Sequence, residues 1–206
     1  MKDPRFPKLV VFINSLVPLA MLGWDFSQDQ LGVNWQEKVI HTTGMLGLIF
    51  LILSLAVTPV RLISGLNWLI HFRRMLGLFA FFYGLMHLSM YFVLQRSMSF
   101  AGILDDTLKR KFIFFGMASL LLMVPLAATS TNGMIKRLGA AKWKRLHQLA
   151  YLSAISGMIH YYSSSKVTSG VQVGFVVVLT LLLSYRILVP WLPFLKRRRV
   201  VAAPVS

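Results

Sequence analysis

The sequence predicts an all-α integral membrane protein, a six-transmembrane-helix bundle. Of its 206 residues, 56% are hydrophobic, the mean hydropathy is +0.67, and several apolar runs reach the roughly 20 residues that a spanning helix needs. Little sequence lies outside these runs. We therefore expect a single membrane domain over residues 1–206.

Six apolar segments follow one another along the chain, each bounded by polar or basic residues. We predict helices over residues 9–24, 39–60, 75–94, 112–130, 146–162 and 171–195. The first contains Pro18, which can bend a membrane helix. The polar residues 25–38, the stretch around Asp105 and Asp106, and the basic stretch from Lys136 to Arg145 are expected to form loops.

The distribution of basic residues predicts the orientation of the bundle. Six crossings place both termini on one side of the membrane. Sixteen of the 22 lysines and arginines fall on that side, and five of the six acidic residues fall on the other. Because basic residues accumulate in cytoplasmic loops, the N- and C-termini are both expected to be cytoplasmic.

Composition argues against several classes of function. The net charge is +16, but nucleic-acid-binding proteins carry their basic residues on a soluble core, which this chain lacks. The chain has no cysteine, so disulfides, zinc thiolates and iron–sulfur clusters are excluded. The first apolar run has no small-residue cleavage site, so we expect a retained helix there and not a cleaved signal peptide.

Histidines inside membrane helices are the candidate functional residues, because ionisable side chains there are costly. His147 and His160 lie thirteen residues apart on one predicted helix, roughly 20 Å along its axis, so they approach opposite faces of the bilayer. His87 lies thirteen residues after Arg74 on a helix that runs in the same direction. His87 and His160 are therefore expected at a similar depth, nearer the outer face.

Two neutral imidazoles at one depth on two helices can supply both axial ligands of a haem iron, which suits electron transfer. Two other interpretations stay open at this point. Each histidine could be a hydrogen-bonded packing residue, or the histidines could relay protons in a transporter. A transporter usually carries acidic residues inside its helices, whereas here every Asp and Glu is expected in a loop or in the N-terminal arm.

Several motifs resemble the MsrQ family (also called YedZ), the haem-binding membrane subunit of the bacterial methionine-sulfoxide reductase system. This family belongs to the ferric-reductase-like transmembrane superfamily. The resemblance covers residues 41–186 and is carried by HFRRMLGLFAFFYGLMHLSMYF, by TSTNGMIKRLG, and by WKRLHQLAYL followed by IHYY.

The resemblance implies a multi-pass protein of the bacterial inner membrane that carries electrons. We do not expect the chain itself to turn over methionine sulfoxide, because its outer loops have no cysteine to attack sulfur and no cluster of ligands for molybdenum. MsrQ-like proteins take electrons from the quinone pool, or from a cytoplasmic flavin reductase. They pass these electrons through one or two b-type haems, with FMN as a further cofactor. The acceptor is the periplasmic molybdenum enzyme MsrP, which reduces methionine sulfoxide in oxidised proteins. The family's haem-associated histidines match His87, His147 and His160.

The chain departs from the superfamily at the inner end of the third helix. Arg73 and Arg74 stand where the oxidases of the superfamily have a fourth histidine. Arginine is always protonated and is not an ordinary iron ligand, but it suits a haem propionate or an FMN phosphate. His147 could then bind a second haem together with His71, or it could serve a flavin or a quinone. His41 could be a spare ligand, a proton carrier or a surface residue.

Two functions compete with electron transfer to MsrP. One is a stand-alone ferric or cupric reductase of the same superfamily, which needs a flavin reductase supplied by another protein. The other is the proton-coupled transporter. A purely structural membrane anchor would leave the matched histidines unexplained.

Overall fold

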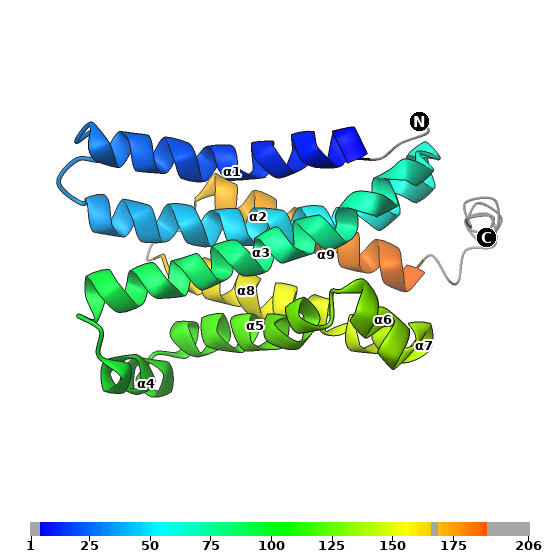
Figure 1. The fold of residues 1–206 in the computed structure, drawn as a ribbon. Coiled ribbons are helices and arrows are strands. Elements are labelled where there is room, and N and C mark those ends of the chain that lie inside the picture. The colour runs from blue at the N-terminus through cyan, green and yellow to red at the C-terminus, as the bar shows by residue number, and fades with distance from the viewer. Residues whose placement is uncertain (1–4, 166–168, 189–206) are drawn as a thin grey trace.

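The computed structural model describes residues 5–165 and 169–188, and these are almost entirely helical (Figure 1). The long helices run side by side: α1 (Arg5–Ser27), α2 (Trp35–Ser64), α3 (Ile70–Met90), α5 (Lys111–Ala128), α8 (Leu149–Ser163) and α9 (Gly170–Leu188). The short elements are the 3₁₀ turn η1 (Asn67–Leu69), the π-helix η2 (Tyr91–Gln95), α4 (Phe100–Lys109), α6 (Asn132–Leu138) and α7 (Ala140–Leu146). The predicted all-α class is confirmed.

Five helical segments of the described chain are long and apolar enough to cross a membrane. They are α1, α2, the continuous segment Asn67–Gln95, α5 and α9. Helix α8 has 15 residues, or roughly 22 Å of rise against a hydrocarbon core of roughly 30 Å. A sixth crossing at α8 is therefore not established by length.

The bundle is built from two closely packed helix pairs, α2 with α3 and α5 with α8. Small residues allow the close approach in each pair. A Cβ atom added to Gly47 of α2 would lie 3.2 Å from the backbone nitrogen of Gly84 on α3. In the other pair, the hydroxyls of Ser119 and Ser153 each donate to the other residue's carbonyl, at 2.9 and 3.0 Å.

Aromatic side chains of α3 serve mainly as packing residues. Tyr83 is fully buried, stacks on Phe50 at a centroid distance of 5.4 Å, and donates its hydroxyl hydrogen to the Ser15 carbonyl at 2.6 Å. Phe79 packs between Phe12 and Phe50. These contacts tie α1 and α2 to α3.

Some predicted loops are wrong. The stretch 136–145 is largely helical, since α6 and α7 occupy it and only Gly139, at φ 76°, separates them. The stretch around Asp105 and Asp106 forms α4, whose N-cap Ser99 accepts a hydrogen bond from the Gly102 amide. Asp25 and Glu37, expected in a loop, lie in the last turn of α1 and the first turn of α2.

The predicted helix from Trp143 through Tyr162 is interrupted. Helix α7 ends at Leu146 and α8 begins at Leu149, with His147 and Gln148 in a turn between them. The amides of Gln148 and Tyr151 bond to carbonyls three residues earlier, which tightens the chain at this point. His147 therefore lies at a break between two helices and not within a continuous α-helix.

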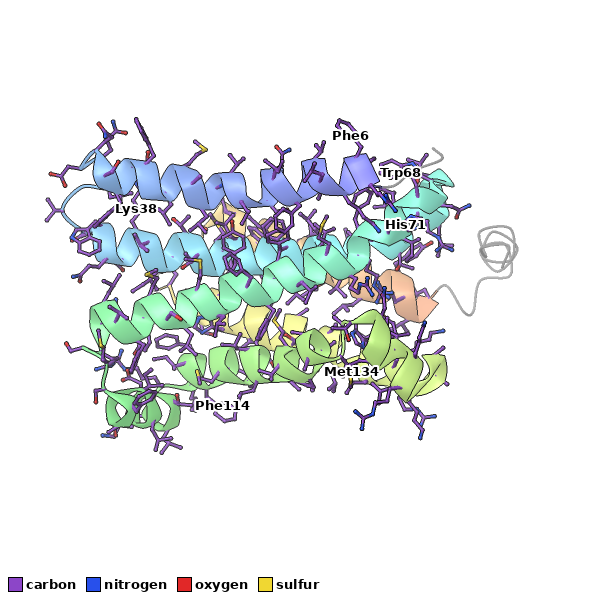
Figure 2. All side chains as sticks on the ribbon, viewed as in Figure 1. Phe6, Lys38, Trp68, His71, Phe114 and Met134 are labelled. Atoms are coloured by element: carbon purple, nitrogen blue, oxygen red, sulfur yellow. The ribbon has the colours of Figure 1, made fainter. Side chains whose placement is uncertain are left out.

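The described ends of the chain lie at the same end of the bundle. The start of α1 and the end of α9 lie at the same end of the bundle as α6 and α7, and α4 is at the opposite end (Figure 1). Figure 2 shows Phe6, Trp68 and His71 at the first of these ends and Lys38 at the other. Residues 189–195 of the last predicted helix and the basic run 196–199 lie outside the described residues.

Candidate functional site

His87 is held on α3 by the backbone of α2. Its Nδ1 lies 2.8 Å from the carbonyl oxygen of Ile40. The ring rests against Gly44, one turn further along α2, where an added Cβ would lie only 2.8 Å from His87 Nδ1. A side chain at position 44 would therefore collide with the imidazole.

His160 is held on α8 by α5 in the same way. Its Nδ1 lies 2.7 Å from the carbonyl oxygen of Phe112. The ring rests against Gly116, where an added Cβ would again lie 2.8 Å from Nδ1. The two helix pairs thus repeat one arrangement, in which a histidine is bound to a carbonyl and lies over a glycine four residues further on.

The rings of His87 and His160 lie next to each other, which agrees with the common depth predicted for them. Their ring centroids are 5.9 Å apart and the ring planes are inclined by 72°. A carbonyl oxygen can only accept, so each Nδ1 carries the hydrogen and each Nε2 has a free lone pair. This tautomer is the one in which histidine binds a metal through Nε2, with the other nitrogen fixed by a hydrogen bond.

The pair lines a cavity of about 290 Å³ between α2, α3, α5 and α8. Glycines form part of its wall: Gly44, Gly47, Gly84, Gly116 and Gly157. Exposed polar residues form one end of the cavity: Glu37, His41, Gln95 and Arg110. The remaining wall is mainly apolar, which is the composition of a site for a mostly apolar ligand with one polar edge.

The residues present fit a metal held by two imidazoles. Metal–imidazole bonds are roughly 2.0–2.1 Å long, so two imidazoles on opposite sides of one ion have ring centres roughly 6 Å apart. The observed separation of 5.9 Å is close to that value. No group of three or more His, Cys, Asp or Glu residues within residues 5–165 and 169–188 could hold a metal ion.

His147 lies at the opposite end of α8 from His160. Its Nδ1 donates to the Trp143 carbonyl at 3.1 Å, and its ring stacks on the Trp143 indole with centroids 3.8 Å apart. Its Nε2 is buried and has no hydrogen-bond partner among the described residues. A buried, unpaired acceptor is costly, so this nitrogen is a candidate contact for a bound group.

The two arginines of α3 lie at this same end. Arg73 lies close enough to His147 for its positive charge to interact electrostatically with the imidazole. Arg74 donates through Nη1 to Asn132 Oδ1 at 2.6 Å. His71 is exposed, and its Nδ1 donates to the Trp68 carbonyl at 2.9 Å. The described contacts of His71 do not include His147.

His41 lies at the polar end of the cavity. Its side chain is 58% exposed, and Nε2 is 3.6 Å from a carboxylate oxygen of Glu37. It belongs to the cavity wall, but it is not part of the fixed histidine pair.

Sequence reasoning missed the glycines and carbonyls that position the pair. A usable signal exists in the spacing, because Gly44 follows Ile40 by four residues and Gly116 follows Phe112 by four. Which histidine faces which glycine depends on the pairing of helices, and no single segment encodes that pairing.

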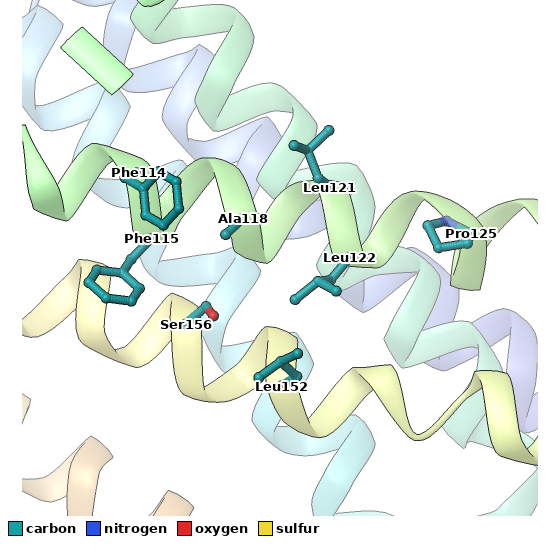
Figure 3. Close-up of a pocket in the computed structure, with 8 residues that line it drawn as sticks. All are labelled: Phe114, Phe115, Ala118, Leu121, Leu122, Pro125, Leu152 and Ser156. Atoms are coloured by element: carbon teal, nitrogen blue, oxygen red, sulfur yellow. The ribbon is translucent and has the colours of Figure 1, made fainter. Parts of the chain in front are cut away.

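A second hollow lies between α5 and α8 on the outside of the bundle. Figure 3 shows its lining of apolar side chains with Ser156 among them: Phe114, Phe115, Ala118, Leu121, Leu122, Pro125, Leu152 and Ser156. Its volume is about 420 Å³. With no charged or titratable group in its lining, it offers no chemistry and suits a lipid chain.

Comparison with known proteins agrees with this architecture. The family model for the ferric reductase like transmembrane component matches residues 18–158. The protein-methionine-sulfoxide reductase heme-binding subunit MsrQ of Rhodospirillum rubrum is 42% identical over 200 residues, which cover 97% of this chain and 94% of that protein.

Two further relatives carry the same name. The MsrQ of Ralstonia nicotianae is 43% identical over 161 residues, covering 78% of this chain and 74% of that protein. The MsrQ of Polaromonas naphthalenivorans is 40% identical over 197 residues, covering 95% and 89% respectively. The chain therefore belongs to the ferric reductase-like transmembrane family and, within it, to the MsrQ family.

Proposed function

We propose that this chain is the haem-binding, electron-transferring membrane subunit of a methionine-sulfoxide reductase system. His87 and His160 would hold the iron of a b-type haem through their Nε2 atoms. The observation that carries the proposal is the matched pair, with Nδ1 bound to a carbonyl at 2.8 and 2.7 Å and ring centroids 5.9 Å apart. The relatives are named as heme-binding subunits, which supports haem as the bound group.

The protein's own contribution is to fix the ligands in advance. The carbonyls of Ile40 and Phe112 select one tautomer of each imidazole and stop the ring from rotating. The glycines at 44 and 116 leave room for the rings in that position. A haem with two imidazole ligands supplies a one-electron carrier whose iron has no open position for a substrate.

The chain would join a donor of electron pairs to an acceptor of electron pairs. Oxidation of a quinol to a quinone releases two electrons and two protons, and reduction of methionine sulfoxide to methionine and water consumes two of each. We propose the quinone pool, or a cytoplasmic flavin reductase, as the donor and the periplasmic enzyme MsrP as the acceptor. Sulfoxide reduction belongs to the partner, because this chain has no cysteine to attack sulfur.

The inner end of the bundle would hold a second group. The buried, unpaired Nε2 of His147 can bind iron or accept a hydrogen bond, and Arg73 and Arg74 can pair with a haem propionate or with the phosphate of FMN. His71 is the weaker partner for His147 because it is exposed. Pigment analysis distinguishes these outcomes, since haem and flavin are extracted and measured separately.

The orientation completes the proposal. With α8 as a crossing, the chain spans the membrane six times with both termini in the cytoplasm. The cavity of His87 and His160 then lies nearer the periplasmic face, where the acceptor is, and His147 lies nearer the cytoplasm.

The test is reoxidation of the purified protein by its proposed acceptor. The protein in lipid nanodiscs is reduced with a quinol analogue, and the b-type absorbance is followed after adding MsrP with or without methionine sulfoxide. We expect reoxidation beyond the electron-accepting capacity of MsrP itself only when both are present. Reoxidation by ferric citrate at a higher rate than by MsrP would instead favour the stand-alone ferric reductase, and an unpigmented protein would favour the transporter.

A further inference from the structure

Helix α4 has a fixed orientation at the end of the bundle, where η2 ends and α5 begins (Figure 1). Its Asp106 is only 5% exposed. The carboxylate accepts hydrogen bonds from Tyr91 and Arg96, and it pairs with Arg110 Nε at 3.2 Å. This buried anchor determines which side of α4 faces the bundle and which sides face outward.

The outward surface of α4 is divided into two sectors. At 100° per residue, Phe100, Leu104 and Leu108 fall on one side of the helix. They are 79%, 61% and 77% exposed. Asp105 and Lys109 form the neighbouring sector, bridged at 2.8 Å, with side chains 57% and 73% exposed. A third sector of the helix faces the bundle and contains Ile103, Asp106 and Thr107.

The apolar sector continues a membrane-spanning surface. The ring of Phe100 packs on Phe92 with centroids 4.7 Å apart, and Phe92 belongs to the spanning segment Asn67–Gln95. Met98, between them in the chain, is 63% exposed. The charged sector leads instead toward Lys111, an exposed basic residue that suits anionic headgroups.

We propose that α4 is an interfacial helix that lies in the boundary of the bilayer. Its apolar sector is buried among the upper acyl chains, and its charged sector faces the headgroups and water. A helix at this boundary has protein, lipid and water on three different sides, which matches the three sectors of α4.

The test uses single cysteines, which the cysteine-free chain allows without further changes. Leu104→Cys and Lys109→Cys variants of the full chain are labelled with a polarity-sensitive fluorophore and reconstituted in vesicles of phosphatidylethanolamine and phosphatidylglycerol. Quenching is then measured with aqueous iodide and with nitroxides attached to the lipid acyl chains. Both positions are exposed, so neither substitution disturbs the packing of the bundle.

We expect the label at position 104 to be quenched several-fold more by the lipid nitroxide, and several-fold less by iodide, than the label at position 109. Leu108→Cys should repeat the behaviour of position 104. Equal iodide quenching at 104 and 109 would overturn the proposal and show a water-facing surface available to a protein. Equal quenching of both labels by the lipid nitroxide would also overturn it, since the charged sector would then lie in the bilayer.

Discussion

The chemistry of the site depends on which nitrogen of each imidazole carries hydrogen. In both His87 and His160 the Nδ1 hydrogen is donated to a backbone carbonyl of a neighbouring helix, and the carbonyl cannot move without unwinding that helix. Nε2 is therefore held ready as a metal ligand before any cofactor arrives. Folding already orders both imidazole rings, so binding of a cofactor loses little of their conformational entropy.

Glycine at position 116 should be required for this arrangement. In Gly116→Ala the new Cβ would lie 2.8 Å from His160 Nδ1, so the ring must turn or α5 and α8 must separate. Overpacking of this kind costs about 1–3 kcal/mol. We expect a lower haem content per chain and a lower melting temperature in detergent. Gly174→Ala is the matched control, because nothing lies within 4 Å of its added Cβ; equal behaviour of the two variants would contradict the prediction.

The sequence allowed the common depth of His87 and His160 to be predicted, but not the residues that surround the two rings. The equal spacing of His87 from Arg74 and of His160 from His147 follows the rise of a helix, so their common depth could be inferred. The positions of Gly44 and Gly116 beneath the rings depend on the rotation of each helix about its axis. Packing between helices fixes that rotation, and the apolar sequence of α2 gives little indication of it.

At the scale of elements, the two helix pairs use the same register. Gly47 lies one turn beyond Gly44 on α2, and Ser119 lies one turn beyond Gly116 on α5. An added Cβ at Gly47 would meet the backbone of Gly84 on α3, and Ser119 is hydrogen-bonded to Ser153 on α8. Small residues at these contacts set the spacing between the two helices of each pair.

Gly47→Ala should separate α2 from α3. The added Cβ would lie 3.2 Å from the backbone nitrogen of Gly84, and backbone cannot swing aside as a side chain can. We expect a fall in melting temperature together with partial loss of the haem absorbance, although position 47 touches neither imidazole. Gly23→Ala on α1 has an added Cβ with open space around it and should leave both quantities unchanged. An unchanged Gly47→Ala protein would contradict the packing argument.

The docking of α4 should depend on pH through Asp106. Burial alone would raise the pKa of this carboxyl, but hydrogen bonds from Tyr91 and Arg96 and the charges of Arg110 and Arg96 outweigh burial, so its pKa is lowered. A lowered pKa stabilises the docked helix above the ordinary Asp value of about 3.9 and loses that effect as pH falls through the folded value. The protection factors of the backbone amides of residues 97–110, which are exchange rates corrected for the intrinsic pH dependence of amide exchange, should therefore fall at acid pH.

Asp106→Asn should show the lowered protection factors already at neutral pH, because the neutral amide does not attract Arg96 and Arg110. Asp105→Asn is the control, since that carboxylate is largely exposed. If the Asp106 variant retained the exchange pattern of the wild type, the anchor would not hold α4.

Over the whole molecule, the apolar runs were enough to predict an all-α membrane bundle. The interruption at His147, the helices in the basic stretch and α4 were not predicted, because short helices depend on caps and tertiary contacts more than on hydropathy. The described ends of the chain lie at one end of the bundle, which is what an even number of crossings requires.

Reporter fusions test the orientation. Green fluorescent protein joined after Gly139 should fluoresce, since we place α6 and α7 in the cytoplasm. Alkaline phosphatase joined after Asp105 should be active, since we place α4 on the periplasmic side. The reverse pattern would contradict the proposed direction of electron transfer.

The most direct test of the central claim is the haem count of histidine variants in the detergent-purified protein. The reduced-minus-oxidised spectrum and a pyridine haemochrome assay are compared for wild type, His87→Ala, His160→Ala, His147→Ala and His41→Ala. We predict that the His87 and His160 variants lose the same single haem, and that His41→Ala keeps the wild-type spectrum. If both the His87 and His160 variants kept the full haem count with an unaltered spectrum, the assignment of this pair as the iron ligands would be wrong.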